Sequence, residues 1–273
     1  MKIKYLGTAA YEGVPAMFCN CEVCKKARAA GGKNIRTRSQ AIVDDKLMID
    51  FNADTVTHTL NYGIDWEKIE GVIVTHSHCD HLYPEDAEIA TGCYSRLHRK
   101  IGFYACKDGY DKLKPYTIDR DTEKTSLTLV EPLKKFTVGE YEILPLPADH
   151  DPASTPVIYS IAKGGKRMLY AHDTGVFLPQ TMDALKKEGR YDFVSFDCTG
   201  CIGNGVDWVY GHMSVLTILP LLDEMKKRGI VDDKTVLAIS HFSHNGGLIH
   251  DDTAIKAAKY GFITAYDGLE IEF

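Results

Sequence analysis

Four potential metal ligands lie within six consecutive positions of the sequence, and they constrain the fold of the chain around them. The run reads His-x-His-x-Asp-His, made by His76, His78, Asp80 and His81. Neutral imidazole nitrogens and carboxylate oxygens are ligands of zinc, manganese and iron. A strand points successive side chains to opposite faces. The four side chains can therefore share a site only if the preceding apolar run, Val72–Val74, ends near Thr75 and the chain then curls around a metal.

Three further candidate ligands follow apolar runs later in the chain. His150 comes after Tyr141–Leu146, Asp173 after Arg167–Ala171 and His241 after Thr235–Ile239. Each run is short and rich in strand-forming residues, so each candidate is expected where a strand ends. A lone histidine after a strand is more often a structural, hydrogen-bonded residue than a ligand. The three candidates therefore indicate a metal site mainly when they are taken together.

These seven residues have the order and rough spacing found in the metallo-β-lactamase superfamily, which the sequence resembles along nearly its whole length. The resemblance implies that His76, His78 and His150 hold one metal, that Asp80, His81 and His241 hold another, and that Asp173 bridges the two. It implies two divalent cations, manganese or zinc, with a hydroxide nucleophile between them. Asp80 is then also expected among the catalytic residues.

Two further residues have expected roles beside this centre. Asp50 belongs to a segment that resembles the superfamily's early Asp-x-Gly, with Asn52 where glycine is usual. Asn tolerates left-handed backbone angles, so the turn can survive. Asp50 either orients a ligand imidazole or caps a helix, and Asp54 is placed to cap a helix over 55–60. His212 is either the general acid of a phosphodiesterase, or a donor to the phosphoryl group, or a structural residue at a helix terminus.

A second metal signal precedes the first in the sequence. Cys19, Cys21 and Cys24 supply three thiols in a short loop over residues 19–24. In a reducing compartment this spacing suits a tetrahedral structural zinc site that lacks one ligand, and His244 is the natural fourth. The alternative is three ordinary reduced thiols. Cys198 and Cys201 are read as structural, although they could form a redox pair or compete for zinc.

The Cys cluster narrows the resemblance to one group of proteins within the metallo-β-lactamase superfamily. Three such cysteines, with a histidine three positions after the last ligand, look like the cyclic-phosphate phosphodiesterases of carbon–phosphorus lyase pathways, which act on 5-phosphoribosyl 1,2-cyclic phosphate. Those proteins are relatives of the tRNA 3′-processing endonucleases. The resemblance implies a metal-dependent phosphodiesterase acting on a small cyclic substrate. The alternatives are a metallo-hydrolase of a lactone, thioester or β-lactam, and a redox or metal-sensing protein.

Strand-like and helical runs alternate along the chain, which by itself predicts only a mixed α and β fold. The resemblance implies a four-layer αββα sandwich with two mixed sheets. Because the candidate ligands extend from His76 to His241, residues 1–273 are expected to form a single domain. Helices are predicted at Glu22–Ala30, Pro179–Lys187 and Ser214–Arg228, where Pro220 is expected to kink the last helix or reset its start.

Composition limits the expected partners and location. The hydrophobic fraction of 44% suits a globular core, and the formal net charge of −6 disfavours nucleic acid as the main partner. The N-terminus lacks the pattern of a signal peptide, and the sequence has no apolar run long enough to span a bilayer. A cytoplasmic protein with a small phosphodiester substrate is expected, without a membrane partner, and a homodimer is one assembly that the sequence allows.

Overall fold

The strands form two sheets of seven strands each. The computed structural model describes residues 1–206 and 208–273. The first sheet has the order β14-β1-β2-β3-β4-β5-β6, with β1 (Lys2–Gly7), β2 (Gln40–Val43), β3 (Leu47–Ile49), β4 (Gly71–Ile73), β5 (Ile101–Ala105), β6 (Thr125–Leu129) and β14 (Glu270–Glu272). The second has the order β13-β12-β11-β10-β9-β8-β7, with β7 (Phe136–Val138), β8 (Tyr141–Pro147), β9 (Val157–Lys163), β10 (Lys166–Ala171), β11 (Phe193–Asp197), β12 (Val236–Ser240) and β13 (Ile263–Thr264).

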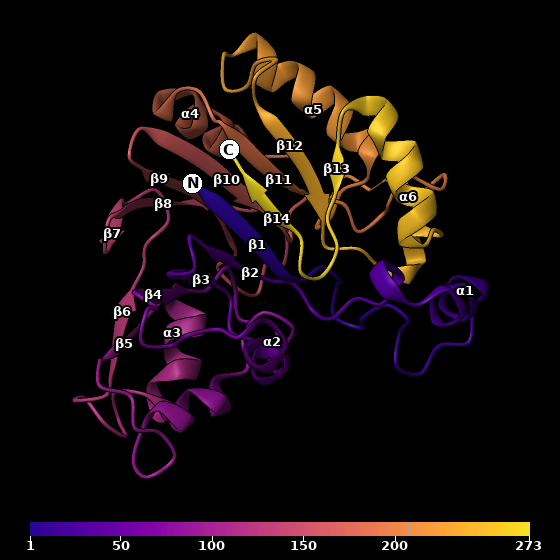
Figure 1. Cartoon of the computed structure of the whole chain (residues 1–273). Coiled ribbons are helices and arrows are strands. Elements are labelled where there is room, and N and C mark those ends of the chain that lie inside the picture. The colour runs from indigo at the N-terminus through magenta and orange to yellow at the C-terminus, as the bar shows by residue number, and fades with distance from the viewer. Residues whose placement is uncertain (207) are drawn as a thin grey trace.

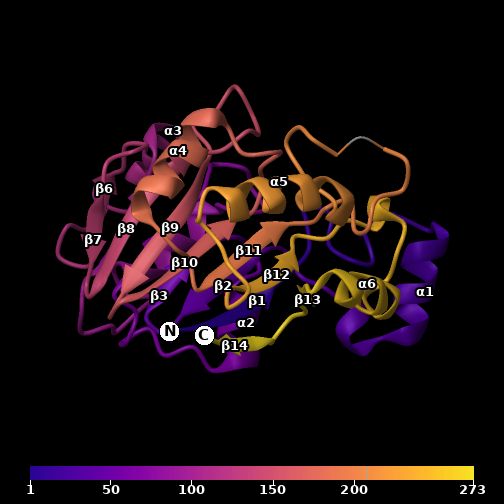
Figure 2. The same ribbon diagram turned by 90° about the horizontal axis from the view of Figure 1, so that it is seen from above.

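Helices cover the outer faces of both sheets (Figure 1). The α-helices are α1 (Glu22–Ala30), α2 (Thr55–Tyr62), α3 (Lys107–Leu113), α4 (Pro179–Glu188), α5 (Val215–Lys227) and α6 (His250–Ala257). The 3₁₀ helices are η1 (Gly32–Asn34), η2 (Pro84–Ala90), η3 (Lys114–Tyr116), η4 (His244–Gly246) and η5 (Ala258–Tyr260). Seen from above, α5 lies across the second sheet, and α1 lies beside α6 (Figure 2). The expected αββα sandwich is confirmed.

Both sheets have the same arrangement of strand directions. In the first, β14, β1, β2 and β3 pair antiparallel, and β3, β4, β5 and β6 pair parallel. In the second, β7 to β10 pair antiparallel, and β10 to β13 pair parallel. The carboxyl ends of parallel strands meet at one edge of a sheet. Residues that follow β3 and β4, or β8, β10, β11 and β12, are therefore brought to a common edge within each sheet.

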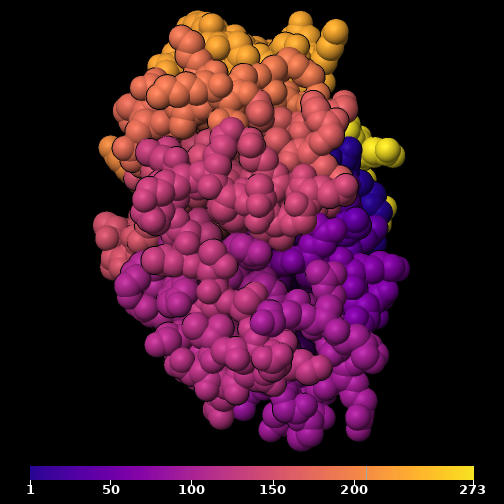
Figure 3. All heavy atoms as spheres, turned by 90° about the vertical axis from the view of Figure 1, so that its left-hand side faces the viewer, coloured from indigo at the N-terminus to yellow at the C-terminus, as the bar shows by residue number. Residues whose placement is uncertain are grey.

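The inner faces of the two sheets pack on each other to form an inter-sheet core. From the first sheet Ile49 and Ile73 point inward, whereas the alternate residues Met48 and Val72 point outward under the helices. Both faces of these strands are therefore apolar, as the sequence runs suggest. A polar contact also crosses this core, since the buried Tyr5 hydroxyl lies 2.7 Å from Ser195 Oγ of β11. In the space-filling view, the purple and magenta segments pack directly against the pink and orange ones (Figure 3).

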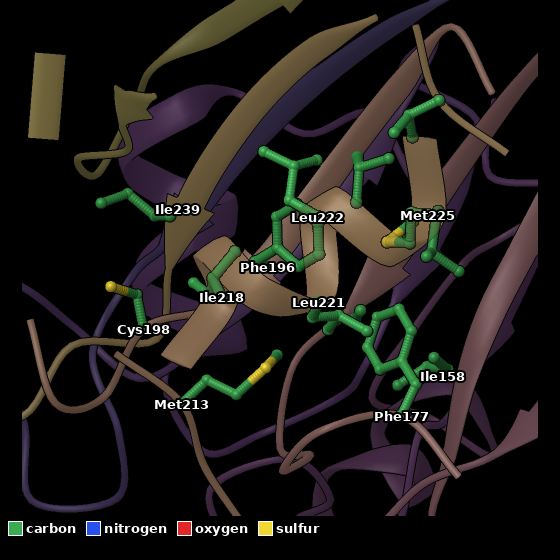
Figure 4. Close-up of a cluster of buried hydrophobic side chains, with 14 of the residues drawn as sticks. Ile158, Phe177, Phe196, Cys198, Met213, Ile218, Leu221, Leu222, Met225 and Ile239 are labelled. Carbon is green, nitrogen blue, oxygen red and sulfur yellow. The ribbon is translucent and has the colours of Figure 1, made fainter. Parts of the chain in front are cut away.

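The outer core of the second sheet is built around α5 (Figure 4). Its buried side chains include Ile218, Leu222 and Met225, which pack with Phe196 and Ile239 of the strands below. Helix α5 begins with a capping box at Ser214 and contains Pro220 in its interior. The proline therefore does not reset the start of the helix, because the cap upstream already fixes it.

The four apolar runs that precede the candidate ligands form β4, β8, β10 and β12, each within one residue of the expected bounds, but several elements were not predicted. These are β7, β13 and β14, with α3 and α6. The three strands have only two or three residues each, too few for an apolar periodicity to be visible. Strand β14 pairs antiparallel with β1, and the terminal amine of Met1 donates to the Phe273 carbonyl over 3.3 Å. The two termini therefore lie side by side, at the ends of these strands remote from Gly7.

Among the residues that the structure describes, no helix combines the length and the hydrophobicity that crossing a membrane requires.

We expect the free energy of unfolding to fall as the pH drops from about 6.5 to about 4. Burial lowers the pKa of His58 to about 4, where its ring lies between Gln40 Oε1 and Thr37 Oγ1. In this window the unfolded chain binds a proton that the native His58 does not, so stability is lost as pH falls, by up to about 3 kcal/mol. Urea unfolding of the metal-free protein and of His58→Gln at pH 7 and pH 4.5 tests this. An equal pH dependence in both proteins would contradict it.

Candidate metal centre

The seven predicted ligands converge at one edge of the sandwich. His76 and the loop to His81 follow β4, His150 follows β8, Asp173 follows β10 and His241 directly follows β12. Strands β8, β10 and β12 run in the same direction, so their carboxyl ends lie at the same edge of the second sheet. The strand order, rather than proximity in sequence, places these residues together.

The first group of three ligand atoms comes from His76, His78 and His150, all within 4.8 Å of one another. His150 Nε2 lies 3.2 Å from His78 Nδ1. Two nitrogens bound to one cation at about 2.0–2.1 Å would be about 2.8–3.4 Å apart in octahedral or tetrahedral geometry. The separation is thus that of two ligands of one ion.

The second group comes from Asp80, His81 and His241, again within 4.8 Å. His81 Nε2 lies 3.4 Å from His241 Nε2. Asp173 lies between the groups: its Oδ2 is 2.6 Å from His81 Nε2 and 3.0 Å from His241 Nε2, and its Oδ1 is 3.7 Å from His150 Nε2. This is the position of a carboxylate that could contact two ions.

The outer nitrogen of each histidine has a partner that fixes the proton there. His81 Nδ1 donates to Asp50 Oδ2 over 2.7 Å, and His150 Nδ1 donates to the Gly211 carbonyl over 3.1 Å. His78 Nε2 donates to Asp151 over 3.2 Å. Carboxylates and carbonyls only accept, so the protons belong to the rings. When these rings are neutral, the nitrogens that face the centre, Nε2 of His81 and His150 and Nδ1 of His78, therefore carry lone pairs.

The same assignment holds for the remaining two ligand histidines. Thr75 Oγ1 donates to Asp50 over 2.8 Å and so accepts from His76 Nδ1 at 3.1 Å. Thr199 Oγ1 donates to the His241 carbonyl and accepts from His241 Nδ1, both over 2.9 Å. Both rings thus present Nε2 to the centre. Asp50 takes the orienting role that was one of its two expected roles.

This arrangement fits a cation better than it fits protons. Among the described residues, His76 Nε2 and Asp173 Oδ2 are buried without a hydrogen-bond partner, and the close approach of His81 Nε2 to Asp173 lacks hydrogen-bond geometry. Buried polar atoms are normally paired. Burial lowers the pKa of His81, but Asp173 and Asp50 outweigh it and hold that pKa well above its usual range. Negative charge therefore dominates here, and the site can hold divalent metal.

Three residues of the centre have left-handed backbone angles. Asp50 has φ 69°, Asp173 has φ 52° and His241 has φ 62°. Such angles are unfavourable for residues other than glycine, by about 1 kcal/mol or more each, and they cluster at functional sites. Each turns the chain sharply where β3, β10 or β12 ends. The expectation that Asn52 takes this conformation is wrong, because the turn is made at Asp50.

Asn52 instead stabilises the start of α2. Its Oδ1 accepts from the Asp54 amide over 3.0 Å, and its Nδ2 donates to the Ser39 carbonyl over 2.9 Å. Asp54 occupies the N-cap position, but its side chain makes no capping hydrogen bond. It accepts from the amide of Arg38 and pairs with its guanidinium. The expected capping role of Asp54 is therefore wrong, since Arg38 competes for the carboxylate.

His212 lies at the centre, held by residues that the sequence analysis missed. His212 Nδ1 is 3.0 Å from Asp197 Oδ2 and 3.1 Å from Thr199 Oγ1. Asp197 is fully buried and also accepts from the amides of Thr199 and Met213. Burial lowers the pKa of His212, but Asp197 outweighs it, so the pKa is raised above its usual value. The signal for Asp197 was available, since it ends the apolar run of β11 much as Asp173 follows β10.

The Cys cluster forms beside this centre. Cys19 Sγ and Cys21 Sγ lie 3.6 and 3.4 Å from His244 Nδ1, and these ligand atoms and Cys24 Sγ are all within 4.8 Å of one another. A tetrahedral ion with bonds of about 2.3 Å to sulfur and 2.0–2.1 Å to nitrogen separates these atoms by about 3.6 Å. The Cys24 amide lowers the pKa of Cys21 to about 6, which favours the thiolate. The four residues can hold a zinc ion.

The other candidate cysteines have no comparable arrangement. Cys198 and Cys201 are buried, and Cys198 Sγ donates to the Cys201 carbonyl over 3.0 Å. Burial raises the pKa of both thiols, which disfavours the thiolate that redox chemistry requires. His172, next to Asp173, faces away from the centre and bonds to Ser39 and Ser195. These contacts are those expected of structural residues.

Comparison with known proteins agrees with the fold and the site. A family model described as "Beta-lactamase superfamily domain" matches residues 49–231, which is more than half of the chain. A curated octanoyltransferase of Porphyromonas gingivalis (strain ATCC BAA-308 / W83) is 26% identical over 280 residues, which cover 99% of this chain and 51% of that protein. The chain thus spans about half the length of this relative.

Solved structures share the fold at low sequence identity. Zn²⁺-bound PqqB from Methylobacterium extorquens superposes with a TM-score of 0.78 at 19% identity, over 100% of both chains. A diphosphatase of the PhnP family superposes at 0.74 and 20% identity, over 100% of this chain and 97% of that one. Human tRNase Z, short form, superposes at 0.63 and 14% identity, over 100% and 99%. The protein therefore belongs to the β-lactamase superfamily and has the metallo-β-lactamase fold.

Proposed function

We propose that the protein is a phosphodiesterase that binds two divalent cations, manganese or zinc, and hydrolyses a small cyclic phosphodiester. The observation that carries this proposal is His212, whose Nε2 has no hydrogen-bond partner among the described residues and which lies beside two groups of candidate ligands that share Asp173. His76, His78 and His150 would hold one cation, and Asp80, His81 and His241 the other. Bound there, the cations would supply an activated water and neutralise charge on the phosphate.

His212 is the proton donor to the departing oxygen in this proposal. Asp197 accepts from Nδ1, so the second proton of the imidazolium is on Nε2. The Asp197 carboxylate also favours the imidazolium electrostatically, which keeps the acid form present near neutral pH. In this proposal Asp80 acts on the attacking water and not on the departing oxygen. Burial raises its pKa, but His81 outweighs it and lowers the pKa to about 2, so Asp80 stays ionised and can accept a hydrogen bond from the attacking water.

The charge around the centre favours a diester over a monoester. Among the contacts of the described residues, no lysine or arginine side chain pairs with the seven ligands or with His212. Asp50, Asp151 and Asp197 add negative charge around the histidines. A phosphomonoester dianion carries one more negative charge than a diester, and a site whose candidate ligands pair with no lysine or arginine side chain compensates it less well.

An acyl substrate is the second candidate. A nucleophilic water that attacks phosphorus can also attack a carbonyl, and the curated relative from Porphyromonas gingivalis is named an octanoyltransferase. A thioesterase or lactonase activity would use the same ligands. A thioester releases a thiolate, which departs without a proton. Thioester hydrolysis therefore gives His212 no role as an acid.

A substrate panel tests the proposal directly. We expect the manganese- or zinc-loaded protein to hydrolyse glycerol 1,2-cyclic phosphate and bis(p-nitrophenyl) phosphate, with kcat/KM at least about 100-fold above that for p-nitrophenyl phosphate or an octanoyl thioester. Metal content measured on the same sample confirms loading. Turnover of the thioester or of a lactone without turnover of either phosphodiester would refute the proposal.

The role of His212 predicts a dependence on the leaving group. His212→Ala should retain its metals and lose about 100-fold or more in kcat on the cyclic substrate, which releases an alkoxide. On bis(p-nitrophenyl) phosphate the loss should be below about tenfold, because nitrophenolate departs without a proton. His98→Ala is the control, since His98 is exposed and bonds only to Glu67. Equal losses on both substrates would remove His212 as the acid.

We propose in addition that Cys19, Cys21, Cys24 and His244 hold one structural zinc. Cys21→Ser should lose one zinc per chain, and its Tm should fall by about 4 °C or more, as expected for about 2 kcal/mol in a protein of this size. Cys93→Ser is the matched control, because Cys93 is exposed and outside the cluster. Zinc analysis with calorimetry measures both. Unchanged zinc content in Cys21→Ser would rule out this site.

A further inference from the structure

Tyr210 is exposed at the rim of the metal centre, and its backbone is fixed there. The side chain is 82% exposed, although Gly211 and His212 follow it directly. The Gly211 amide donates to the Asp149 carbonyl over 3.1 Å, and the Gly211 carbonyl accepts from His150. The amide of Val176 donates to the Val209 carbonyl over 3.0 Å. The peptide groups on both sides of Tyr210 are therefore tied to segments that carry ligands of the centre.

Two glycines allow this segment to lie so close to the centre. A Cβ on Gly175 would lie 2.2 Å from the Val209 carbonyl oxygen and 2.8 Å from Tyr210 Cα. A Cβ on Gly200 would lie 2.6 Å from the ring of Trp208. Gly175 is two positions after Asp173, and Gly200 follows Thr199, which bonds to His212 and His241. Close approach of this kind requires glycine, so the Trp208–Tyr210 segment is packed in place on the rim.

The two aromatic side chains of the segment differ in what holds them. The Trp208 ring lies on Gly200, and its Nε1 donates to Asn204 Oδ1 over 3.2 Å. The Tyr210 ring faces solvent, and its hydroxyl has no hydrogen-bond partner among the residues that the structure describes. A rigid backbone that presents an uncommitted aromatic ring beside a reactive site is suited to bind a flat group by stacking, at little cost in conformational entropy.

We propose that Tyr210 is a specificity-determining residue that stacks on a flat ring, a nucleobase or an aryl group, carried by one ester arm of the phosphodiester. The inference rests on the proposed function. It makes ring-bearing phosphodiesters, such as nucleoside cyclic phosphates, the preferred class over aliphatic ones. Because the ring of the substrate takes no part in bond breaking, stacking binds the ground state and the transition state alike. Loss of the stack therefore changes KM and leaves kcat in place.

The test compares two cyclic phosphodiesters that differ in the ring, adenosine 2′,3′-cyclic phosphate and glycerol 1,2-cyclic phosphate. Tyr210→Ala should raise KM for the adenosine substrate about tenfold, with kcat within about twofold, and leave KM for the glycerol substrate unchanged. Tyr210→Phe should restore the low KM, because the ring is retained. Tyr260→Ala, which removes a partly exposed tyrosine in η5, should change neither. An equal rise in KM for both substrates, or no rise, would overturn the proposal.

Failure of the proposed function is distinguishable from failure of this inference. If the wild-type protein hydrolyses neither substrate, the phosphodiesterase proposal fails, and equilibrium binding decides the role of Tyr210. Calorimetric titration of the metal-loaded protein with adenosine monophosphate and with glycerol phosphate then measures the two binding affinities. Tighter binding of adenosine monophosphate that Tyr210→Ala abolishes supports stacking, and equal binding of the two ligands overturns it.

Discussion

The candidate metal centre depends on histidine nitrogens and carboxylate oxygens whose lone pairs face one another at a buried edge of the sandwich. Each ligand histidine has its outer nitrogen committed to a carboxylate, carbonyl or hydroxyl, as His81 has to Asp50 and His150 to Gly211. The inner nitrogens are left as acceptors, and they face the carboxylates of Asp173 and Asp80. Acceptors repel acceptors unless a cation lies between them. The outer hydrogen bonds therefore leave the site suited to a cation.

The fold makes this arrangement available. Parallel strands carry Asp50 and His76 to one edge of the first sheet, and Asp173, Asp197 and His241 to one edge of the second. The inter-sheet core holds the two edges opposite each other, with both faces of β3 and β4 buried. The left-handed turns at Asp50, Asp173 and His241 are then supported by packing on every side, which lets the chain hold unfavourable backbone angles at three points of the site.

Much of the fold and of the candidate site could be predicted from the sequence, because the candidate ligands follow short apolar runs that are recognisable as strands. The bounds of α1 agree with the run that predicts them, those of β12 agree to within one residue, and the side chains of the seven candidate ligands lie close together. Asp197 was missed although it ends the apolar run of β11. Thr199 was missed because its contacts with His212 and His241 depend on the parallel pairing of β11 and β12, which no local pattern encodes. The left-handed turn was expected at Asn52 because asparagine tolerates that backbone conformation. Its position is set instead by the hydrogen bonds of Asp50 with Thr75 and His81.

The pairing of β14 with β1 has a consequence for longer proteins built on this fold. Met1 and Phe273 lie at the end of that pair opposite to Gly7, whereas the segment after Gly7 approaches Phe242, next to His241. A polypeptide extended at either terminus would thus emerge on the side remote from the ligands. An added unit of the length that the octanoyltransferase relative has beyond the matched part would therefore leave the access of substrate to the candidate metal centre open.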